Sequence, residues 1–201
     1  MPWNTSLFLR INASSDPGQA AMLVLGMLAS GPVLLAPILL TGLWVWGDQK
    51  RRSALLAVAV GLFAGQGLNM LLGLIWYEPR PFMTGVGHTW IAHVADNGFP
   101  SDHATLAWSL GLGLILTGGS RRWGIAACLL GVVAGWARVY LGVHYPWDVL
   151  VSAPVGLAAG TAAFFVEPAM RARVAPSIER LYDAVLDRVP VRIPLPRRIR
   201  P

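Results

Sequence analysis

Two histidines and one aspartate have the residue types and the spacing for phosphoryl transfer. Asp148 follows His144 by four positions, about one helical turn. A nucleophilic histidine needs an acceptor for the ring nitrogen that does not attack. Pro146 fits the first turn of a helix from which Asp148 would point back toward His144. Together with His103, one histidine can attack phosphorus while the other protonates the leaving oxygen, so we predict His144, His103 and Asp148 as catalytic residues.

Two arginines and a serine are predicted to bind phosphate. Arg80 and Arg138 carry fork-shaped, permanently charged groups that match phosphate oxygens. Arg138 follows fifteen uncharged residues, and a charge at that depth in a membrane segment is a functional candidate; the alternative is an arginine that reaches the lipid headgroups. Ser101 precedes a predicted helix whose free N–H groups can bind an anion, although Ser101 and Asp102 could instead only cap that helix.

The segments that must position these residues are long and apolar. Hydrophobic residues make up 55% of the 201-residue chain and charged residues 13%, about half the charged fraction of a typical soluble domain. Five predominantly apolar runs cover residues 20–47, 53–77, 104–120, 123–143 and 149–166. Because about 20 apolar residues cross a bilayer as a helix, we predict an all-α, polytopic membrane helix bundle with about five transmembrane helices. The polar, proline-broken stretch 78–103 is predicted as a loop.

Positive charges are distributed asymmetrically between these spans. With five spans, thirteen of the sixteen lysines and arginines fall on one side, which the positive-inside rule makes cytoplasmic. We therefore expect a multi-pass protein of the cell inner (plasma) membrane, with its N-terminus and active site outside and its C-terminus in the cytoplasm. We attribute the formal charge of +6 to interaction with anionic membrane lipids, and we expect no nucleic-acid partner.

The C-terminal region differs from the spans. Apolar residues from Pro176 to Val189 recur on one helical face and charges occupy the other, which predicts an amphipathic helix on the membrane interface; a helix packed against the protein itself is the alternative. We divide the chain into a membrane-embedded domain at residues 1–170 and a cytoplasmic, basic, amphipathic tail at residues 171–201. The N-terminus shows no cleavable signal pattern, so we expect the first apolar run to remain as a span.

Three segments resemble the signature motifs of the type 2 phosphatidic acid phosphatase superfamily. The first family motif is a lysine, six residues and Arg-Pro, here residues 73–81 with Gly73 in the lysine position. The second is Pro-Ser-any-His, here residues 100–103. The third is Ser-Arg, five residues, His, three residues and Asp, here residues 137–148 with Ala137 in place of serine. The second and third motifs match in order and in internal spacing, and together they are highly specific.

Further strings are similar to one subgroup of that superfamily, the bacterial undecaprenyl-diphosphate phosphatases of the bacitracin-resistance type. They are Asn69, Tyr77-Glu78-Pro79-Arg80-Pro81-Phe82, His93-Val94-Ala95-Asp96 and Phe99-Pro100-Ser101-Asp102-His103. The resemblance covers roughly residues 20–167 and marks the domain at 1–170 as a lipid phosphatase domain. It implies that a polyprenyl diphosphate lipid is the substrate. Undecaprenyl diphosphate would be hydrolysed to undecaprenyl phosphate and inorganic phosphate through a phosphohistidine, which recycles the lipid carrier of peptidoglycan synthesis and confers bacitracin resistance.

The resemblance also implies a role for each site residue. These are His144 as nucleophile, His103 as general acid and then base for water, Asp148 as the group that orients His144, and Arg80, Ser101 and Arg138 as ligands of the transferring phosphoryl group. His93 and Asp102 are further candidates for substrate contact, and a loop histidine that caps backbone is the alternative for His93. The family is metal-independent, and Glu78 and Asp96 lack the spacing of metal ligands, so we expect no metal and no cofactor.

Two alternative functions stay open at this point. A phosphatase for phosphatidate, phosphatidylglycerophosphate or another isoprenyl diphosphate keeps the chemistry and changes the substrate. A non-catalytic lipid-phosphate-binding membrane protein or transporter keeps only the binding. The soluble vanadium haloperoxidases share the motifs, but the apolar spans and the glycine at position 73 argue against them. The sequence does not predict the oligomeric state.

Overall fold

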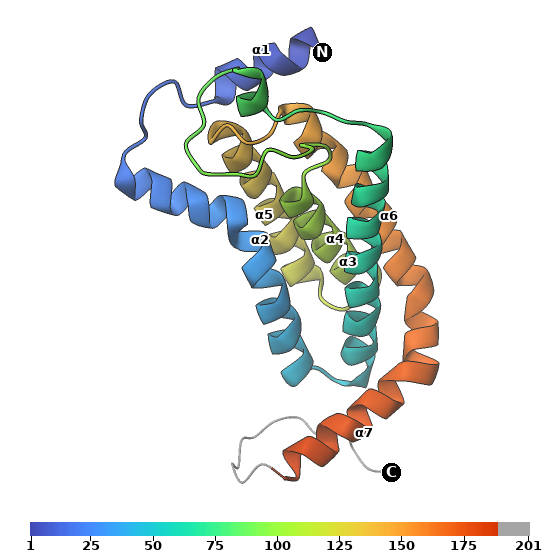
Figure 1. Ribbon diagram of the computed structural model, residues 1–201. Coiled ribbons are helices and arrows are strands. Elements are labelled where there is room, and N and C mark those ends of the chain that lie inside the picture. The colour runs from blue at the N-terminus through green and yellow to red at the C-terminus, as the bar shows by residue number, and fades with distance from the viewer. Residues whose placement is uncertain (189–201) are drawn as a thin grey trace.

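The computed structural model describes residues 1–188, and these residues form a helical bundle without strands. Its elements are α1 (Pro2–Ile11), α2 (Gln19–Val45), α3 (Gln49–Ile75), the 3-10 helix η1 (Pro81–Thr84), α4 (Asp102–Leu116), α5 (Arg121–Tyr140), α6 (Pro146–Ala169), the π-helix η2 (Met170–Val174) and α7 (Ala175–Leu186). Helices α2 to α6 run up and down the bundle, α1 lies across one end, and α7 lies at the other (Figure 1). We call these two ends of the bundle the α1 end and the α7 end. The all-α class predicted from the sequence is confirmed.

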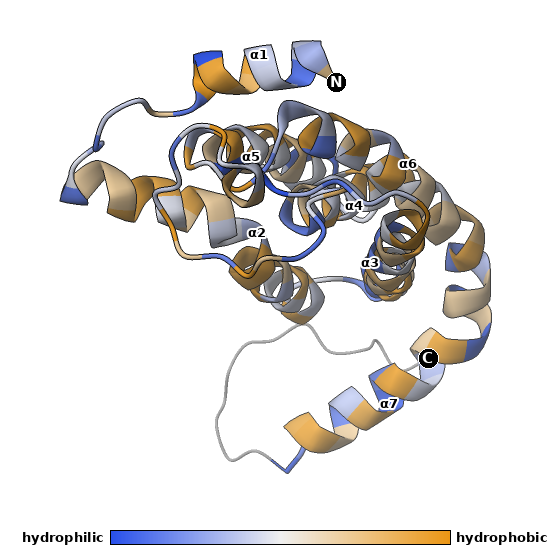
Figure 2. Cartoon of the chain, turned by 45° about the horizontal axis from the view of Figure 1, so that its top comes forward, coloured by the Kyte–Doolittle hydropathy of each residue, from blue (hydrophilic) through white to orange (hydrophobic). Residues whose placement is uncertain are grey.

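Small residues let the helices of the bundle pack closely, and large apolar residues cover its outer surface. A Cβ atom on Gly61 would lie 2.8 Å from the carbonyl oxygen of Ala159, and one on Gly65 would lie 2.6 Å from Oγ of Ser109. Glycine at these positions therefore lets α3 approach α6 and α4 closely, as small residues do between membrane helices. Large apolar side chains such as Phe63 face outward, and Figure 2 shows hydrophobic residues along the helices of the bundle.

Helix α4 is the centre of the bundle and is shorter than the predicted third span. It contacts α2, α3, α5 and α6, and eight of its 15 residues are buried. The expected run 104–120 ends as a helix at Leu116 because Gly118 adopts a φ of 72°, which a glycine tolerates and most other residues do not. At 1.5 Å per residue, α4 is about 22 Å long, less than the ~30 Å hydrocarbon core.

Four helices of the described chain are long and apolar enough to cross a membrane: α2, α3, α5 and the continuous run Pro146–Leu186. The prediction of about five spans thus corresponds to a bundle of five helices in which α4 is the short, enclosed member. Because α4 is surrounded by the other four, its length need not match the hydrocarbon thickness. The chain is a membrane protein.

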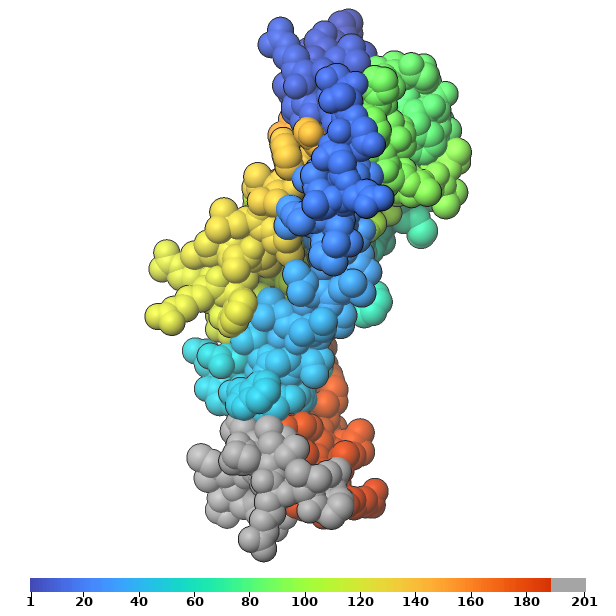
Figure 3. Space-filling view, turned by 90° about the vertical axis from the view of Figure 1, so that its left-hand side faces the viewer, coloured from blue at the N-terminus to red at the C-terminus, as the bar shows by residue number. Residues whose placement is uncertain are grey.

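The helix of α6 continues through η2 into α7 without a break. The predicted amphipathic helix at 176–189 corresponds to α7, whereas the basic stretch after residue 188 lies outside the described residues. Tyr182 packs against the α7 end of the bundle, where the guanidinium carbon of Arg52 lies 4.6 Å from its ring centre, while Leu181 and Val185 are exposed. The turn between α2 and α3 adjoins α7 (Figure 3), so one face of α7 packs on the protein and another stays uncovered.

The sequence analysis did not predict helix α1. Phe8 is fully buried and packs against Val139 and Tyr145. Asn4 Oδ1 accepts a hydrogen bond from the backbone N–H of Trp147 at 3.0 Å. α1 therefore covers the turn between α5 and α6, which carries His144.

Candidate active site

His144 and Asp148 lie at the junction of α5 and α6, at the α1 end. Asp148 stands in the first turn of α6, as predicted, and its Oδ2 accepts a hydrogen bond from the backbone N–H of Tyr145 at 2.8 Å. The same oxygen lies 3.4 Å from Nδ1 of His144. Both side chains are buried, with 1% and 0% exposure. The helix start thus fixes the carboxylate and directs it at one nitrogen of the imidazole.

Arg80 approaches the same ring and lies close to both of its nitrogens. Its Nη1 lies 3.1 Å from Nε2 of His144 and 3.5 Å from Nδ1. Nη1 also donates to the carbonyl of Val143 at 2.9 Å, and Nε pairs with Asp96 Oδ1 at 2.7 Å. A nitrogen this close to both ring nitrogens lies over the face of the imidazole and not along the lone pair of Nε2. The tautomer with its hydrogen on Nδ1 would donate that hydrogen to Asp148 and leave the Nε2 lone pair available.

The surroundings of His144 favour the neutral imidazole. Burial, and after it the charges of Arg138 and Arg80, hold the pKa of His144 well below its usual value of 6.5, against a weaker opposing effect of a hydrogen bond to the Gly98 backbone. A neutral ring keeps a lone pair at neutral pH. His144 therefore has the protonation state that a nucleophile needs.

Ser101 brings the beginning of α4 to the same place. It is the N-cap of α4, and its backbone N–H donates to the carbonyl of Asp148 at 3.1 Å. Ser152 Oγ donates to the carbonyl of Ser101 at 3.0 Å, which joins α4 to α6 a second time. Oγ of Ser101 is buried and has no hydrogen-bond partner among residues 1–188. A hydroxyl and the free N–H groups of a helix start thus face the site, an arrangement suited to an anion.

His103 and Arg138 complete the group. His103 stands in the first turn of α4 and interacts electrostatically with Arg138, His93 and Arg80. Arg138 is in the last turn of α5 and 2% exposed. Its Nε is buried without a hydrogen-bond partner in the described chain. An arginine with an unpartnered buried N–H, next to a second arginine, can bind a multiply charged anion such as phosphate.

His93 is held at the edge of this group. Its Nε2 lies 2.9 Å from Nη2 of Arg138, and its Nδ1 lies 3.1 Å from the carbonyl of Val94. The ring centre is 6.4 Å from that of His144. Burial, opposed by the Val94 hydrogen bond, lowers the pKa of His93. His93 therefore contacts both a side chain of the site and the backbone. This geometry is consistent with substrate contact and with capping of the loop backbone.

Asp102 points to a different partner. Its Oδ1 accepts a hydrogen bond from Nδ2 of Asn69 at 2.7 Å. Asn69 Oδ1 in turn accepts from Thr105 Oγ1 at 3.0 Å. The side chain of Asp102 ties α4 to α3, and a contact with substrate stays a prediction.

Two contributors to the site were not found from the sequence. Asp96 was considered only as a metal ligand, yet it pairs with Arg80. Asn97 makes four side-chain hydrogen bonds beside it. Both lie in an irregular loop, where neither periodicity nor spacing carries information about contacts.

Within residues 1–188, no three His, Cys, Asp or Glu side chains gather as a metal site would require.

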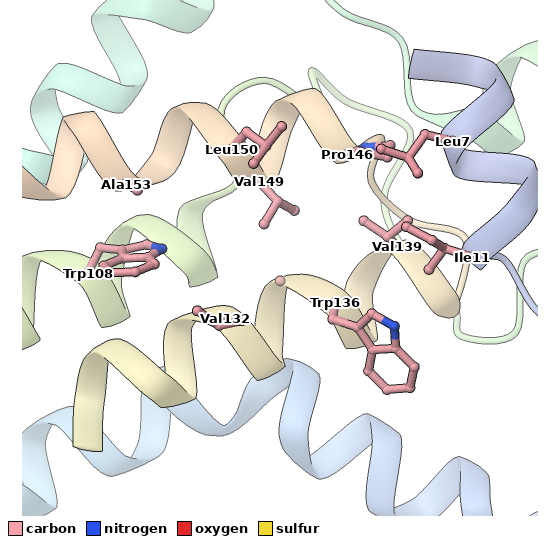
Figure 4. A pocket seen from close by; sticks show the side chains of 11 residues that line it. Leu7, Ile11, Trp108, Val132, Trp136, Val139, Pro146, Val149, Leu150 and Ala153 are labelled. Carbon is pink, nitrogen blue, oxygen red and sulfur yellow. The ribbon is translucent and has the colours of Figure 1, made fainter. Parts of the chain in front are cut away.

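Apolar grooves open between the helices. One is lined by residues of α1, α5 and α6 together with Trp108 of α4 (Figure 4). Another lies between α2 and α3 and includes Leu106 and Gln66. Gln66 Nε2 donates to the backbone carbonyl of Asp102 at 3.3 Å, so this second groove adjoins the beginning of α4. A lipid chain in it would have its polar head near the site.

Comparison with known proteins gives consistent results. The model of the PAP2 superfamily matches residues 54–170. The chain is 32% identical over 168 residues to "Putative undecaprenyl-diphosphatase YbjG" of Escherichia coli (strain K12), covering 83% of this chain and 84% of that protein. It is 28% identical over 186 residues to "Undecaprenyl-diphosphatase BcrC" of Bacillus subtilis (strain 168), covering 92% and 95%.

Two solved structures share the fold. The crystal structure of Aquifex aeolicus LpxE superposes with a TM-score of 0.67 at 23% identity, covering 80% of this chain and 94% of that one. A PAP2-type phosphatidylglycerolphosphate phosphatase from Bacillus subtilis superposes with a TM-score of 0.59 at 20% identity, covering 86% of each chain. At these identities the likeness concerns the fold.

Proposed function

The chain belongs to the PAP2 superfamily, and from that premise we propose that it hydrolyses undecaprenyl diphosphate to undecaprenyl phosphate and inorganic phosphate. The observation that carries the proposal is the His144 ring, with Asp148 Oδ2 3.4 Å from one nitrogen and Arg80 Nη1 3.1 Å from the other. The names of two relatives support the substrate. Hydrolysis at this site recycles the lipid carrier of the cell wall.

The first chemical step is attack by His144. Nε2 forms a bond to the terminal phosphorus while the bond from that phosphorus to the bridging oxygen breaks. The negative charge of the bound diphosphate favours the protonated form of His103, which gives its proton to the bridging oxygen, and undecaprenyl phosphate leaves. Asp148 stabilises the positive charge that develops on the imidazole. The product of this step is a phosphohistidine.

The second step is hydrolysis of that intermediate. His103, now neutral, takes a proton from water, and the water oxygen bonds to phosphorus as the N–P bond breaks. Inorganic phosphate is released and His144 returns to its neutral form. Arg80, Arg138 and Oγ of Ser101 hold the phosphoryl oxygens through both steps, since charge stabilisation is the main demand of phosphoryl transfer.

The lipid chain needs an apolar path next to this site. The groove between α2 and α3 adjoins the beginning of α4 through the bond of Gln66 to Asp102, and we assign the polyprenyl chain to it. The basic residues of the described chain that cluster at the α7 end are Lys50, Arg51, Arg52, Arg121, Arg122, Arg171, Arg173, Arg180 and Arg188. By the positive-inside rule, we assign the α7 end to the cytoplasm and the active site to the outer face of the inner membrane.

The division of the chain at residue 170 stays a proposal of the same kind. Residue 170 is the first of the π-helix η2, and η2 is where α6 passes into α7. We keep residues 1–170 as the phosphatase domain and residues 171–201 as the cytoplasmic tail.

The test is a substrate panel with the purified full-length protein in detergent. Phosphate release is measured for undecaprenyl diphosphate, farnesyl diphosphate, phosphatidate and phosphatidylglycerophosphate, with a chelator present. We expect the polyprenyl diphosphate to be preferred and His144→Ala to abolish release, with exposed His88 replaced by alanine as the control. A preference for a glycerophospholipid would move the substrate to another lipid, and release by His144→Ala equal to wild type would rule out the nucleophile.

A further inference from the structure

The side chain of Asn97 is fully engaged beside the active site. Its Nδ2 donates to the backbone carbonyls of Gly73 at 2.8 Å and Trp76 at 3.0 Å. Its Oδ1 accepts from the backbone N–H of Glu78 at 3.0 Å and of Phe99 at 3.1 Å. An asparagine amide has two donor hydrogens and two acceptor sites. All four are used on backbone, so Asn97 is a connector between segments and not a phosphate ligand.

The four bonds join three segments. The two carbonyls belong to the end of α3, where a helix leaves its last carbonyls without partners. Glu78 begins the segment that leads to Arg80, and Phe99 begins the one that leads to Ser101. A single side chain therefore fixes the end of α3, the approach to Arg80 and the approach to α4.

The backbone next to Asn97 contacts the site directly. The carbonyl of Asn97 accepts a hydrogen bond from Nη2 of Arg80 at 3.2 Å. A Cβ on the following Gly98 would lie 3.3 Å from Cγ of Arg80 and 3.3 Å from Oδ2 of Asp148. The chain at 97–98 thus passes between the arginine and the carboxylate, and a shift of this segment moves the Arg80 guanidinium relative to His144.

The glycine at position 73 is part of the same arrangement. A Cβ at Gly73 would lie 3.2 Å from Nδ2 of Asn97 and 3.3 Å from the carbonyl oxygen of Phe99, tighter than ordinary van der Waals contact. A side chain at position 73 therefore competes with the loop that Asn97 anchors. The glycine stands where the resemblance leads one to expect a lysine, and it leaves this close approach of the loop undisturbed.

We propose that Asn97, with Gly73 opposite it, is the positioning residue that sets the place of Arg80 and of the N-terminus of α4 in the active site. The inference rests on the proposed function for its catalytic readout. The geometric part of the inference is that Asn97, through Arg80, sets how well the site stabilises a transferring phosphoryl group, and this part holds for any phosphate substrate.

The experiment uses the full chain in detergent with four single variants: Asn97→Asp, Asn97→Ala, Gly73→Ala and Gly73→Lys. Asn97→Asp retains both acceptor contacts, loses both donors and sets a carboxylate against two carbonyls. We expect kcat for undecaprenyl diphosphate to fall 10- to 100-fold in each variant while KM changes less than threefold, because displacement of a group that acts on the transition state lowers kcat. Gly67→Ala, on the same helix with open space around its Cβ, is the matched control and should retain activity.

A double-mutant cycle separates positioning from a general loss of structure. If Asn97 acts in part through Arg80, the fold loss in kcat caused by Asn97→Asp should be at least threefold smaller in an Arg80→Ala background than in wild type, because effects that share a partner are not additive; the loss that is left is the effect on the N-terminus of α4. Equal fold losses in both backgrounds overturn the inference. So does a Gly73→Lys variant as active as wild type.

Binding of orthovanadate, an analogue of the five-coordinate transition state of phosphoryl transfer, is measured by calorimetry in the same proteins. We expect Asn97→Asp to weaken it about 10-fold. If wild type binds vanadate but releases no phosphate from polyprenyl diphosphates, the proposed function fails while the vanadate affinities still decide the role of Asn97. If Asn97→Asp binds vanadate as wild type does, the role of Asn97 is refuted whatever the substrate.

Discussion

Nη1 of Arg80 lies 3.1 Å from Nε2 and 3.5 Å from Nδ1 of His144, so the guanidinium is held against the face of the imidazole. This places a permanent positive charge beside the proposed nucleophile, where it favours the neutral ring and can bind the oxygens of a phosphoryl group.

Arg80→Lys should lower kcat/KM roughly 100-fold, because one ammonium cannot replace a rigid fork that serves several acceptors. In the wild type the guanidinium contacts His144, Asp96 and two backbone carbonyls. Initial rates of phosphate release give the measurement. The control is Arg10→Lys on exposed α1, and rates within twofold of wild type for Arg80→Lys would argue against the fork.

The pH dependence of kcat/KM should reflect the lowered pKa of His144. The reactive form is neutral, so activity is present above the pKa of His144 in the folded protein and is lost as the pH falls through it. Because burial and the arginine charges hold that pKa well below 6.5, activity should persist at pH 6. An acidic limb centred above pH 6.5 would contradict the environment described for the ring.

Asp148→Asn should lower kcat by roughly 100- to 10,000-fold while the protein stays folded, because the amide keeps the shape but not the charge that stabilises an imidazolium. An asparagine oxygen can still accept the hydrogen bond of Tyr145, so the α6 cap is retained. Stopped-time assays with labelled substrate reach the low rates needed. Asp16→Asn, on the exposed linker before α2, serves as the control.

Asn12→Ala should lower the free energy of unfolding by about 1–3 kcal/mol, the cost of leaving buried polar groups unpaired. Nδ2 of Asn12 donates to the carbonyls of His88 and Tyr140, and its Oδ1 accepts from the His88 N–H. SDS-induced unfolding in mixed micelles measures the change, with exposed Ser6→Ala as the control. An unchanged unfolding midpoint would mean that the hydrogen bonds of Asn12 to His88 and Tyr140 contribute nothing to stability.

Gly61→Ala should destabilise the bundle by about 1–3 kcal/mol through overpacking. The added Cβ would lie 2.8 Å from a backbone oxygen of Ala159 and 2.9 Å from Cβ of Ala163, and a backbone atom cannot rotate away. The same unfolding assay applies, and Gly67→Ala in the same helix should be neutral or stabilising. If both glycine variants behave alike, the close approach of α3 to α6 is not what position 61 requires.

The class of the molecule and the reactive groups that we propose could both be predicted from the sequence. Runs of apolar residues predict membrane helices because length and hydropathy are local properties. The four-residue spacing of His144 and Asp148 brings the pair together because it is one turn at a helix start. Ser101 at the N-cap of α4 follows from the same kind of local argument.

How distant segments meet could not be predicted from the sequence and depends on the tertiary structure. The pairing of Arg80 with Asp96, the four bonds of Asn97 and the cover of α1 join residues in irregular loops and different helices, for which no sequence period exists. The length of α4 was also a tertiary matter, since a helix enclosed by four others is not required to span the hydrocarbon core. Spacing along the chain predicts contacts within one helical turn, such as His144 with Asp148. Contacts between separate segments, such as Arg80 with Asp96, depend on how the helices and loops pack.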